Sequence, residues 1–244
     1  MLWAEAAAVL SEIGTPTAVM AIIDLKYRAG DSELGDDIAR SLGDVRNSDS
    51  HELLLAVLVE SQDDRVVQAC TEALGASFES NDARRLAEEI ESLPPSESRD
   101  RLVSLLSHVR NRRAVSGLMS LLDPERHPSD DDVLQSAATA LAHADAPDAA
   151  AYLLSLIDRP DAPPHQVYEA AISINGEKAK RTLMETATGG KLGTRVETRQ
   201  IAVLALANYP DETTVEFLMT LQRDDNAEVA NSASHVLALL ARQL

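Results

Sequence analysis

The sequence predicts an all-α protein, a right-handed α-solenoid of about seven and a half helix–turn–helix repeats of roughly 32 residues. Three observations predict it. A pair of adjacent positions recurs along the chain with Leu or Ile always second. An apolar residue stands three positions before each pair, and Gly or Pro separates helix-sized stretches. Because one helix pair cannot bury its apolar face alone, such repeats stack and share a continuous core.

The first helix of each repeat, the A helix, carries the recurring pair. The pairs are Val9-Leu10, Ser41-Leu42, Ala73-Leu74, Leu105-Leu106, Ala140-Leu141, Ser173-Ile174, Ala205-Leu206 and Val236-Leu237. The apolar positions three residues earlier are Ala6, Ile38, Cys70, Leu102, Ala137, Ala170, Ala202 and Ala233. Residues at i, i+3 and i+4 share one helix face, so these positions are predicted to be buried.

The second helix, the B helix, has one core position thirteen residues after the first member of the pair. These positions are Ile22, Leu54, Leu86, Leu118, Leu153 and Leu218, with Leu183 in the shorter sixth repeat. A last A helix is expected over residues 228–243. Seven helix pairs and one additional A helix therefore account for the chain.

Residues that interrupt helices fall between these stretches. The glycines that follow A helices, where left-handed caps are expected, are Gly14, Gly43, Gly75 and Gly176. Thr15-Pro16 places a capping hydroxyl and a first-turn proline at a B-helix start. Ser129 is predicted to cap the A helix of the fifth repeat, with the acids 130–132 at the positive helix end.

The segment from Ala6 to Val19 resembles the short HEAT repeats of the phycobilisome-lyase type, with an Ala-rich helix, an Ile-Gly turn and a Pro-x-Ala-Val helix start. Residues 69–75 and 137–142 look similar. The likeness covers essentially the whole chain and implies a single armadillo-like repeat domain over residues 1–244. It implies architecture more than activity, because this family includes scaffolds, lyases and subunits of larger assemblies.

The charge of the chain limits its partners. The formal net charge is −18, and aromatic residues make up only 3%. Nucleic acid and anionic membranes both require a concentrated basic face, which the sequence lacks, so neither is expected as a partner. A protein partner is expected instead, with a basic patch or with an acidic segment that meets a local basic site. The alternative is that the acidity serves only solubility.

Cysteine usage and hydropathy indicate the compartment and exclude some chemistry. The single Cys70 allows no intrachain disulfide and is interpreted as a small core residue. The longest apolar stretch, Leu53–Val59, is too short to span a membrane. No signal peptide is visible, and the first cation is Lys26, so a cytoplasmic location is expected.

No catalytic, cofactor or metal residue is assigned, and no cofactor is expected. Iron-holding HEAT enzymes similar to deoxyhypusine hydroxylase have several His-Glu pairs, whereas this chain has only His51-Glu52, interpreted as an exposed helix start. Residues 189–194 are interpreted as a linker because a phosphate loop would need a preceding strand. The predicted function is a non-enzymatic protein-binding scaffold. The alternative is a phycobilin-lyase-like enzyme or lyase subunit.

The B helices are expected to line a concave face. The positions opposite the core carry two basic islands, which are the candidate partner-binding sites. The first island is Arg84 with Arg113, joined by nearby Arg85 and Arg112, and the second is Lys178 with Arg181. An ordinary solvated face with scattered ion pairs is the alternative. The lengthened connections at residues 124–132, 158–165 and 188–194 offer a second candidate surface along one edge.

The two ends of the predicted solenoid lack clearly polar capping repeats. The first A helix starts almost at Met1, and the last A helix has no B partner. Uncovered solenoid ends favour association with other chains. The sequence is therefore consistent with a fragment of a longer protein or with a protein that self-associates through its ends, and both interpretations stay open.

Overall fold

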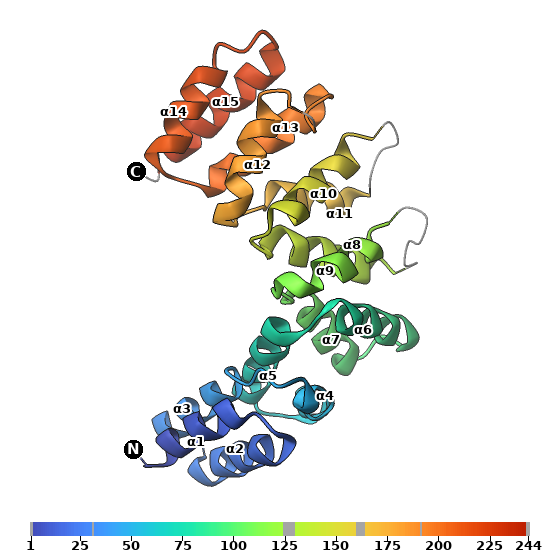
Figure 1. Ribbon diagram of the computed structural model, residues 1–244, viewed down its shortest axis with the longest axis vertical. Coiled ribbons are helices and arrows are strands. Elements are labelled where there is room, and N and C mark those ends of the chain that lie inside the picture. The colour runs from blue at the N-terminus through green and yellow to red at the C-terminus, as the bar shows by residue number, and fades with distance from the viewer. Residues whose placement is uncertain (1, 31, 124–129, 160–163, 191, 243–244) are drawn as a thin grey trace. The chain divides into compact units, whose positions relative to one another are not determined.

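The structure is a computed structural model that describes residues 2–30, 32–123, 130–159, 164–190 and 192–242 (Figure 1). The chain divides into two compact units, Met1–Gly117 and Leu118–Leu244. Each unit is a stack of antiparallel helix pairs and is described by itself. Among the described residues, no helix is both long enough and apolar enough to cross a membrane.

The first unit alternates A and B helices. Its A helices are α1 (Leu2–Ile13), α3 (Glu33–Leu42), α5 (Asp64–Ser77) and α7 (Glu97–Ser107). Its B helices are α2 (Pro16–Ala29), α4 (His51–Glu60) and α6 (Ser80–Ser92). The short 3₁₀ helices η1 (Ser48–Ser50) and η2 (Arg112–Ala114) lead into α4 and into α8 (Val115–Leu121), which crosses the unit boundary. The A helices pack in order, α1 on α3, α3 on α5 and α5 on α7.

The second unit repeats this arrangement. Its A helices are α9 (Asp131–His143), α11 (His165–Ile172), α13 (Val196–Ala205) and α15 (Ala227–Leu240). Its B helices are α10 (Pro147–Ile157), α12 (Glu177–Ala187) and α14 (Glu212–Leu221), and a 3₁₀ helix η3 (Leu206–Asn208) follows α13. The predicted all-α repeat fold is confirmed, with seven helix pairs and an additional A helix in the part of the chain that the structure describes.

The predicted core positions are confirmed in the interior repeats, except that Ser173 is partly exposed. All seven B-helix core positions are at most 2% exposed, and so are the Leu and Ile of the six interior pairs. The first repeat is different. Ala6 and Val9, predicted as core, are exposed because no helix in the described structure covers that side of α1. The residues of α1 that are buried are Ala7 and Ser11, and α1 packs on both α2 and α3.

Three of the four glycines that were predicted to end A helices in a left-handed conformation do not adopt it. Of the four glycines predicted to cap A helices, only Gly14, at φ 60°, is left-handed, whereas Gly43 and Gly176 have ordinary negative φ angles. Gly75 lies inside α5, which continues to Ser77. A Cβ at Gly75 would lie 2.4 Å from the carbonyl oxygen of His108, and the Gly75 carbonyl accepts the N–H of Arg110 at 2.8 Å. This glycine therefore permits close approach of the next repeat.

Helix starts follow the expected chemistry with one change. Thr15 caps α2, and Pro16 is its first residue, as predicted. The N-cap of α9 is Asp130, whose carboxylate accepts the backbone N–H groups of Asp132 and Val133. Ser129, predicted for this role, lies outside the described residues. The acids at this helix start therefore include the cap itself.

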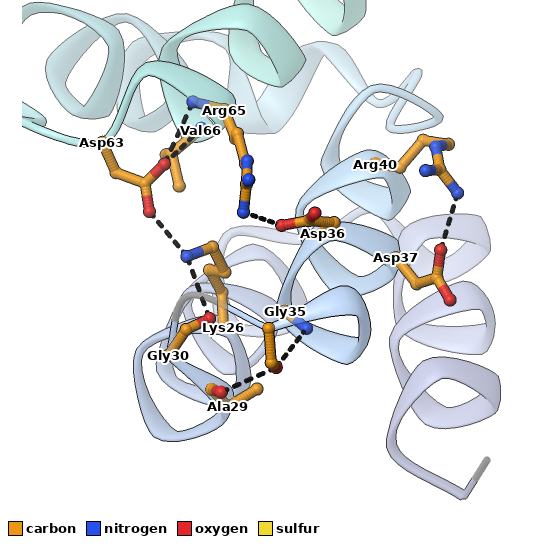
Figure 2. A network of polar contacts seen from close by, with 11 residues as sticks. Lys26, Ala29, Gly30, Gly35, Asp36, Asp37, Arg40, Asp63, Arg65 and Val66 are labelled. Carbon is orange, nitrogen blue, oxygen red and sulfur yellow. Dashed lines mark hydrogen bonds and ion pairs between the residues drawn. The ribbon is translucent and has the colours of Figure 1, made fainter.

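A polar network joins the first three repeats (Figure 2). Lys26 of α2 has a side chain only 2% exposed, and its Nζ lies 2.6 Å from Oδ2 of Asp63, the N-cap of α5. Arg65 reaches back to pair with Asp36 of α3. Burial raises the pKa of Asp63, but hydrogen bonds from Lys26 and from the Arg65 and Val66 backbone outweigh it, so this pKa lies below 3.8.

The repeat register yields a stability prediction. Leu141 is 1% exposed, so Leu141→Ala should lower the free energy of unfolding by about 2–5 kcal/mol. Ser155 was expected to be exposed but is half-buried, and its hydroxyl donates only to the local Tyr152 carbonyl. Ser155→Ala should therefore change stability by less than about 0.5 kcal/mol. Equal losses for the two variants in urea denaturation would contradict this register.

The Lys26–Asp63 pair yields a second prediction. Asp63→Asn removes the carboxylate that lies 2.6 Å from the buried ammonium of Lys26 and should cost about 1.5–3 kcal/mol, the usual contribution of a hydrogen bond to a charged group. The control Arg40→Gln breaks an exposed pair with Asp37 and should cost less than about 1 kcal/mol. Because the pKa of Asp63 is lowered by folding, its contribution is present above pH 3.8 and is lost as pH falls through the folded-state pKa. Urea denaturation at several pH values measures the free energy of unfolding of wild type and of the two variants. If the difference between wild type and Asp63→Asn did not change with pH, the lowered pKa of Asp63 would be contradicted.

Candidate functional site

The B-helix positions opposite the core are exposed to solvent, as predicted. In the first unit this exposed row comprises Thr17, Met20, Asp24, Asp49, Glu52, Ala56, Asn81, Arg84, Glu88, Arg113 and Ser116. In the rest of the row, Ser120, Ala151 and Ser155 are only partly exposed. The row is polar and mixed in charge, so the charge that it presents to a partner depends on which side chains form ion pairs.

The first basic island keeps part of its charge uncompensated. Arg113 pairs with Glu79 at 3.0 Å, while Arg84 is held by the Ser80 carbonyl and the side chain of Asn81. Neither Arg84 nor Arg112 forms an ion pair with any residue that the structure describes. Both are exposed. Local acids therefore neutralise only a fraction of this island.

Arg85 faces a different environment from its neighbour Arg84. It lines a small cavity of 60 Å³ together with three acids, Glu52, Asp82 and Glu89. Arg84 and the Arg113 backbone both form hydrogen bonds with Ser80, so they lie near each other, whereas Arg85 lies beside acidic side chains.

The second basic island is compensated within its own unit. Nζ of Lys178 lies 3.1 Å from the carboxylate of Asp145, and Nε of Arg181 lies 2.7 Å from the carboxylate of Glu185. A hydrogen bond from the Lys178 backbone N–H lowers the pKa of Asp145, and burial opposes it only in part. These cations therefore offer less free charge to a partner than Arg84 and Arg112 do.

A polar cleft of 510 Å³ lies beside the first island. It is formed by the A-to-B turns of repeats two to four, and its lining residues are Arg46, Ser48, His51, Ala76, Ser77, Glu79, Asn81, Asp82, Asn111 and Arg113. Nδ2 of Asn111 donates to the Ser77 carbonyl at 3.1 Å, which ties two neighbouring turns together. The cleft therefore has fixed polar walls with an arginine on each of two non-adjacent turns.

His51 lies at the inner side of this cleft and not at an exposed helix start, which corrects the prediction. It is 8% exposed, and its ring centroid lies 5.0 Å from that of Phe78. Burial lowers the pKa of His51, while the charges of Asp82 and Glu79 raise it by less. A sequence signal existed, because His51 precedes the core residues Leu54 and Leu58 by three and seven positions and thus shares their face.

Ser77, His51 and Asp82 form a chain that resembles a nucleophile, base and acid. Nε2 of His51 lies 2.9 Å from Oγ of Ser77, but Nδ1 lies 3.9 Å from Asp82, beyond hydrogen-bond reach. The Ser77 hydroxyl donates to the Ala73 carbonyl at 2.7 Å, so His51 is the donor in the bond to Ser77. A general base needs the opposite polarity. In this geometry the chain holds the turn in place, and Ser77 is not activated.

The other candidate sites that the sequence offered have weaker support in the structure. Cys70 is fully buried, and burial raises the pKa of its thiol to about 12, which keeps it protonated. In the parts of the chain that the structure describes, no group of three or more His, Cys, Asp or Glu side chains could hold a metal ion. The long-loop surface predicted at residues 124–132, 158–165 and 188–194 lies partly outside the described residues.

The helix pairs and their spacing make the chain an all-helical repeat protein of HEAT-like architecture. No protein-family model matches the sequence, and no curated protein matches it. Human deoxyhypusine hydroxylase, solved in complex with glycerol, is 19% identical over 97% of this chain and 88% of its own, with a TM-score of 0.39. The complex of CpcE and CpcF of phycocyanin lyase from Nostoc sp. PCC7120 is 18% identical over 94% of this chain and 95% of its own, with a TM-score of 0.33. A designed armadillo repeat protein is 17% identical over 92% of this chain and 99% of its own, with a TM-score of 0.27. These likenesses are too distant to assign a function.

The buried position of His51 predicts a titration. Since burial favours the neutral imidazole, its pKa should lie below 6.5, and stability should fall as pH drops from 6.5 towards the folded-state pKa. Proton NMR of the His51 ring measures the pKa, and urea denaturation of wild type and His51→Gln measures the stability. In His51→Gln, the free energy of unfolding should not show the part of this loss that comes from protonation of His51. A pKa above 6.5 would mean that Asp82 and Glu79 outweigh burial.

Proposed function

We propose that this protein is a scaffold that binds another protein along the B helices of its first unit. The partner contributes an acidic segment, which contacts Arg84, Arg112 and Arg113 and enters the adjacent polar cleft. The observation that supports this proposal most directly is the uncompensated charge of Arg84 and Arg112 in a chain of net charge −18. Guanidinium groups bind carboxylates in a bidentate way, which suits such a partner.

The rigidity of the surface also supports binding. The Ser80 hydroxyl donates to the Arg113 carbonyl at 2.6 Å, and its oxygen accepts the Gly117 N–H at 3.1 Å. These bonds fix the start of α6 against η2 and the start of α8. A partner therefore meets arginines whose backbones are already fixed, which reduces the entropy lost on binding.

An enzymatic role of the phycobilin-lyase kind is the alternative. The described residues include no motif that favours a tetrapyrrole, so we do not assign the cleft to one. A bilin titration followed by visible absorbance separates the two roles, since a scaffold leaves the bilin spectrum unchanged.

The proposal predicts different effects at the two islands. After partners are captured from the source organism and identified by mass spectrometry, Arg84→Glu with Arg113→Glu should weaken binding of the purified partner at least tenfold, about 1.4 kcal/mol. The matched control, Lys178→Glu with Arg181→Glu, should change the affinity less than about twofold because those cations are paired locally. Circular dichroism and thermal melting should match wild type for both. Unchanged affinity in the Arg84 double variant, with the fold intact, would remove the island from the binding surface.

A further inference from the structure

The polar cleft beside the first basic island has charged lining residues of both signs. Among the described residues that line it, two are arginines, Arg46 and Arg113, and two are acids, Glu79 and Asp82. The only other titratable side chain in this lining is that of His51, which is 8% exposed. The charges of the arginines and the acids cancel, so the net charge of the cleft depends on whether His51 carries a proton.

The ring nitrogen of His51 that takes up this proton is Nδ1. The Ser77 hydroxyl donates to the Ala73 carbonyl, so Nε2 of His51 carries a hydrogen and donates it to Ser77. In a neutral imidazole the other nitrogen has no hydrogen. That nitrogen, Nδ1, lies 3.9 Å from Oδ2 of Asp82. A proton added at Nδ1 therefore lies next to a carboxylate, and a small movement of either side chain completes a hydrogen bond.

The acids of the cleft are held by the start of α6. The Asp82 carboxylate accepts the backbone N–H of Glu79 at 2.8 Å, and the two residues form a capping box. The carboxylate of Glu79 in turn pairs with Arg113 at 3.0 Å. Because these acids already offset the two arginines, the charge that His51 gains on protonation is not cancelled within the lining of the cleft.

Further charged groups meet His51 in the small cavity of 60 Å³, which it also lines. They come from α4 and α6 and are Glu52, Asp82, Arg85 and Glu89. The elements α5, α7 and η1 also pack on α4, but among the described residues they contribute no charged side chain to either cavity. Burial lowers the pKa of His51, and the charges of Asp82 and Glu79 oppose this only in part. The ring therefore gains its proton below pH 6.5, where the carboxylates of a partner remain ionised.

We propose that protonation of His51 regulates the binding of the acidic segment, which is held more tightly when the ring is charged. This inference rests on the function proposed for the first island. With a neutral ring the cleft has no net charge, so the attraction comes from Arg84 and Arg112 beside it. With a charged ring the wall of the cleft is also cationic, and a partly buried charge is screened by salt less than an exposed one. Mildly acidic solution thus favours binding, and neutral solution favours release.

Fluorescence anisotropy tests this regulation with a short, end-capped, rhodamine-labelled oligo-aspartate peptide at fixed ionic strength. Wild type should bind the peptide about threefold or more tightly at about pH 5.5 than at about pH 7.5, because the cleft gains a charge between them. His51→Gln should lose this increase, since glutamine can still donate to Ser77 but does not titrate. The control His235→Gln removes an exposed imidazole of α15 and should keep the increase. Circular dichroism at both pH values checks that each protein is folded.

Proton NMR of the His51 ring gives a second measurement that needs no variant. A ligand that binds the charged ring more tightly must raise the pKa of that ring, so saturation with the peptide should raise the pKa of His51 in wild type. Three results would each overturn the regulation and leave the proposed function standing: equal affinity at the two pH values, an increase that His51→Gln retains, or an unchanged pKa.

The proposed function is tested separately with the same peptide. Arg84→Glu with Arg113→Glu should weaken peptide binding at both pH values, whether or not His51 regulates it. If wild type did not bind the peptide at either pH, both the regulation and the acidic-segment proposal would be overturned.

Discussion

The structure depends on one constraint, that no helix pair can bury its apolar face without a neighbour. Leu42, Leu74 and Leu106 are fully buried because an adjacent pair lies on each of them, whereas the equivalent Leu10 and Leu237, in the first and last A helices, are partly exposed. The same residue type at the same register is core or surface according to what lies beside it. Stability is therefore set by interfaces between repeats as much as by the repeats themselves.

The turns fix how closely neighbouring repeats approach. Gly75 allows the next turn to contact the α5 backbone, and Asn111 and Arg110 then bind the carbonyl groups of Ser77 and Gly75. In the second unit, Tyr209 donates to the Gly176 carbonyl in the same way, and burial raises the pKa of its phenol. The hydrogen bond between Asn111 and Ser77 joins two residues that line the cleft in the first unit. The elements that hold the stack together thus also position the candidate binding residues.

The sequence was sufficient for the fold and insufficient for the site. Periodicity located the helices and the buried positions because a 3.6-residue repeat depends only on local order in the chain. It could not separate Arg84, which lacks an acidic partner, from Arg181, which pairs with Glu185 on its own helix. It placed Arg85 with Arg84, although in the structure Arg85 lines a cavity with Glu52 of α4 and with Asp82 and Glu89 of its own helix. Which of these cations is paired depends on side-chain packing within and between helices, which the spacing of apolar residues does not encode.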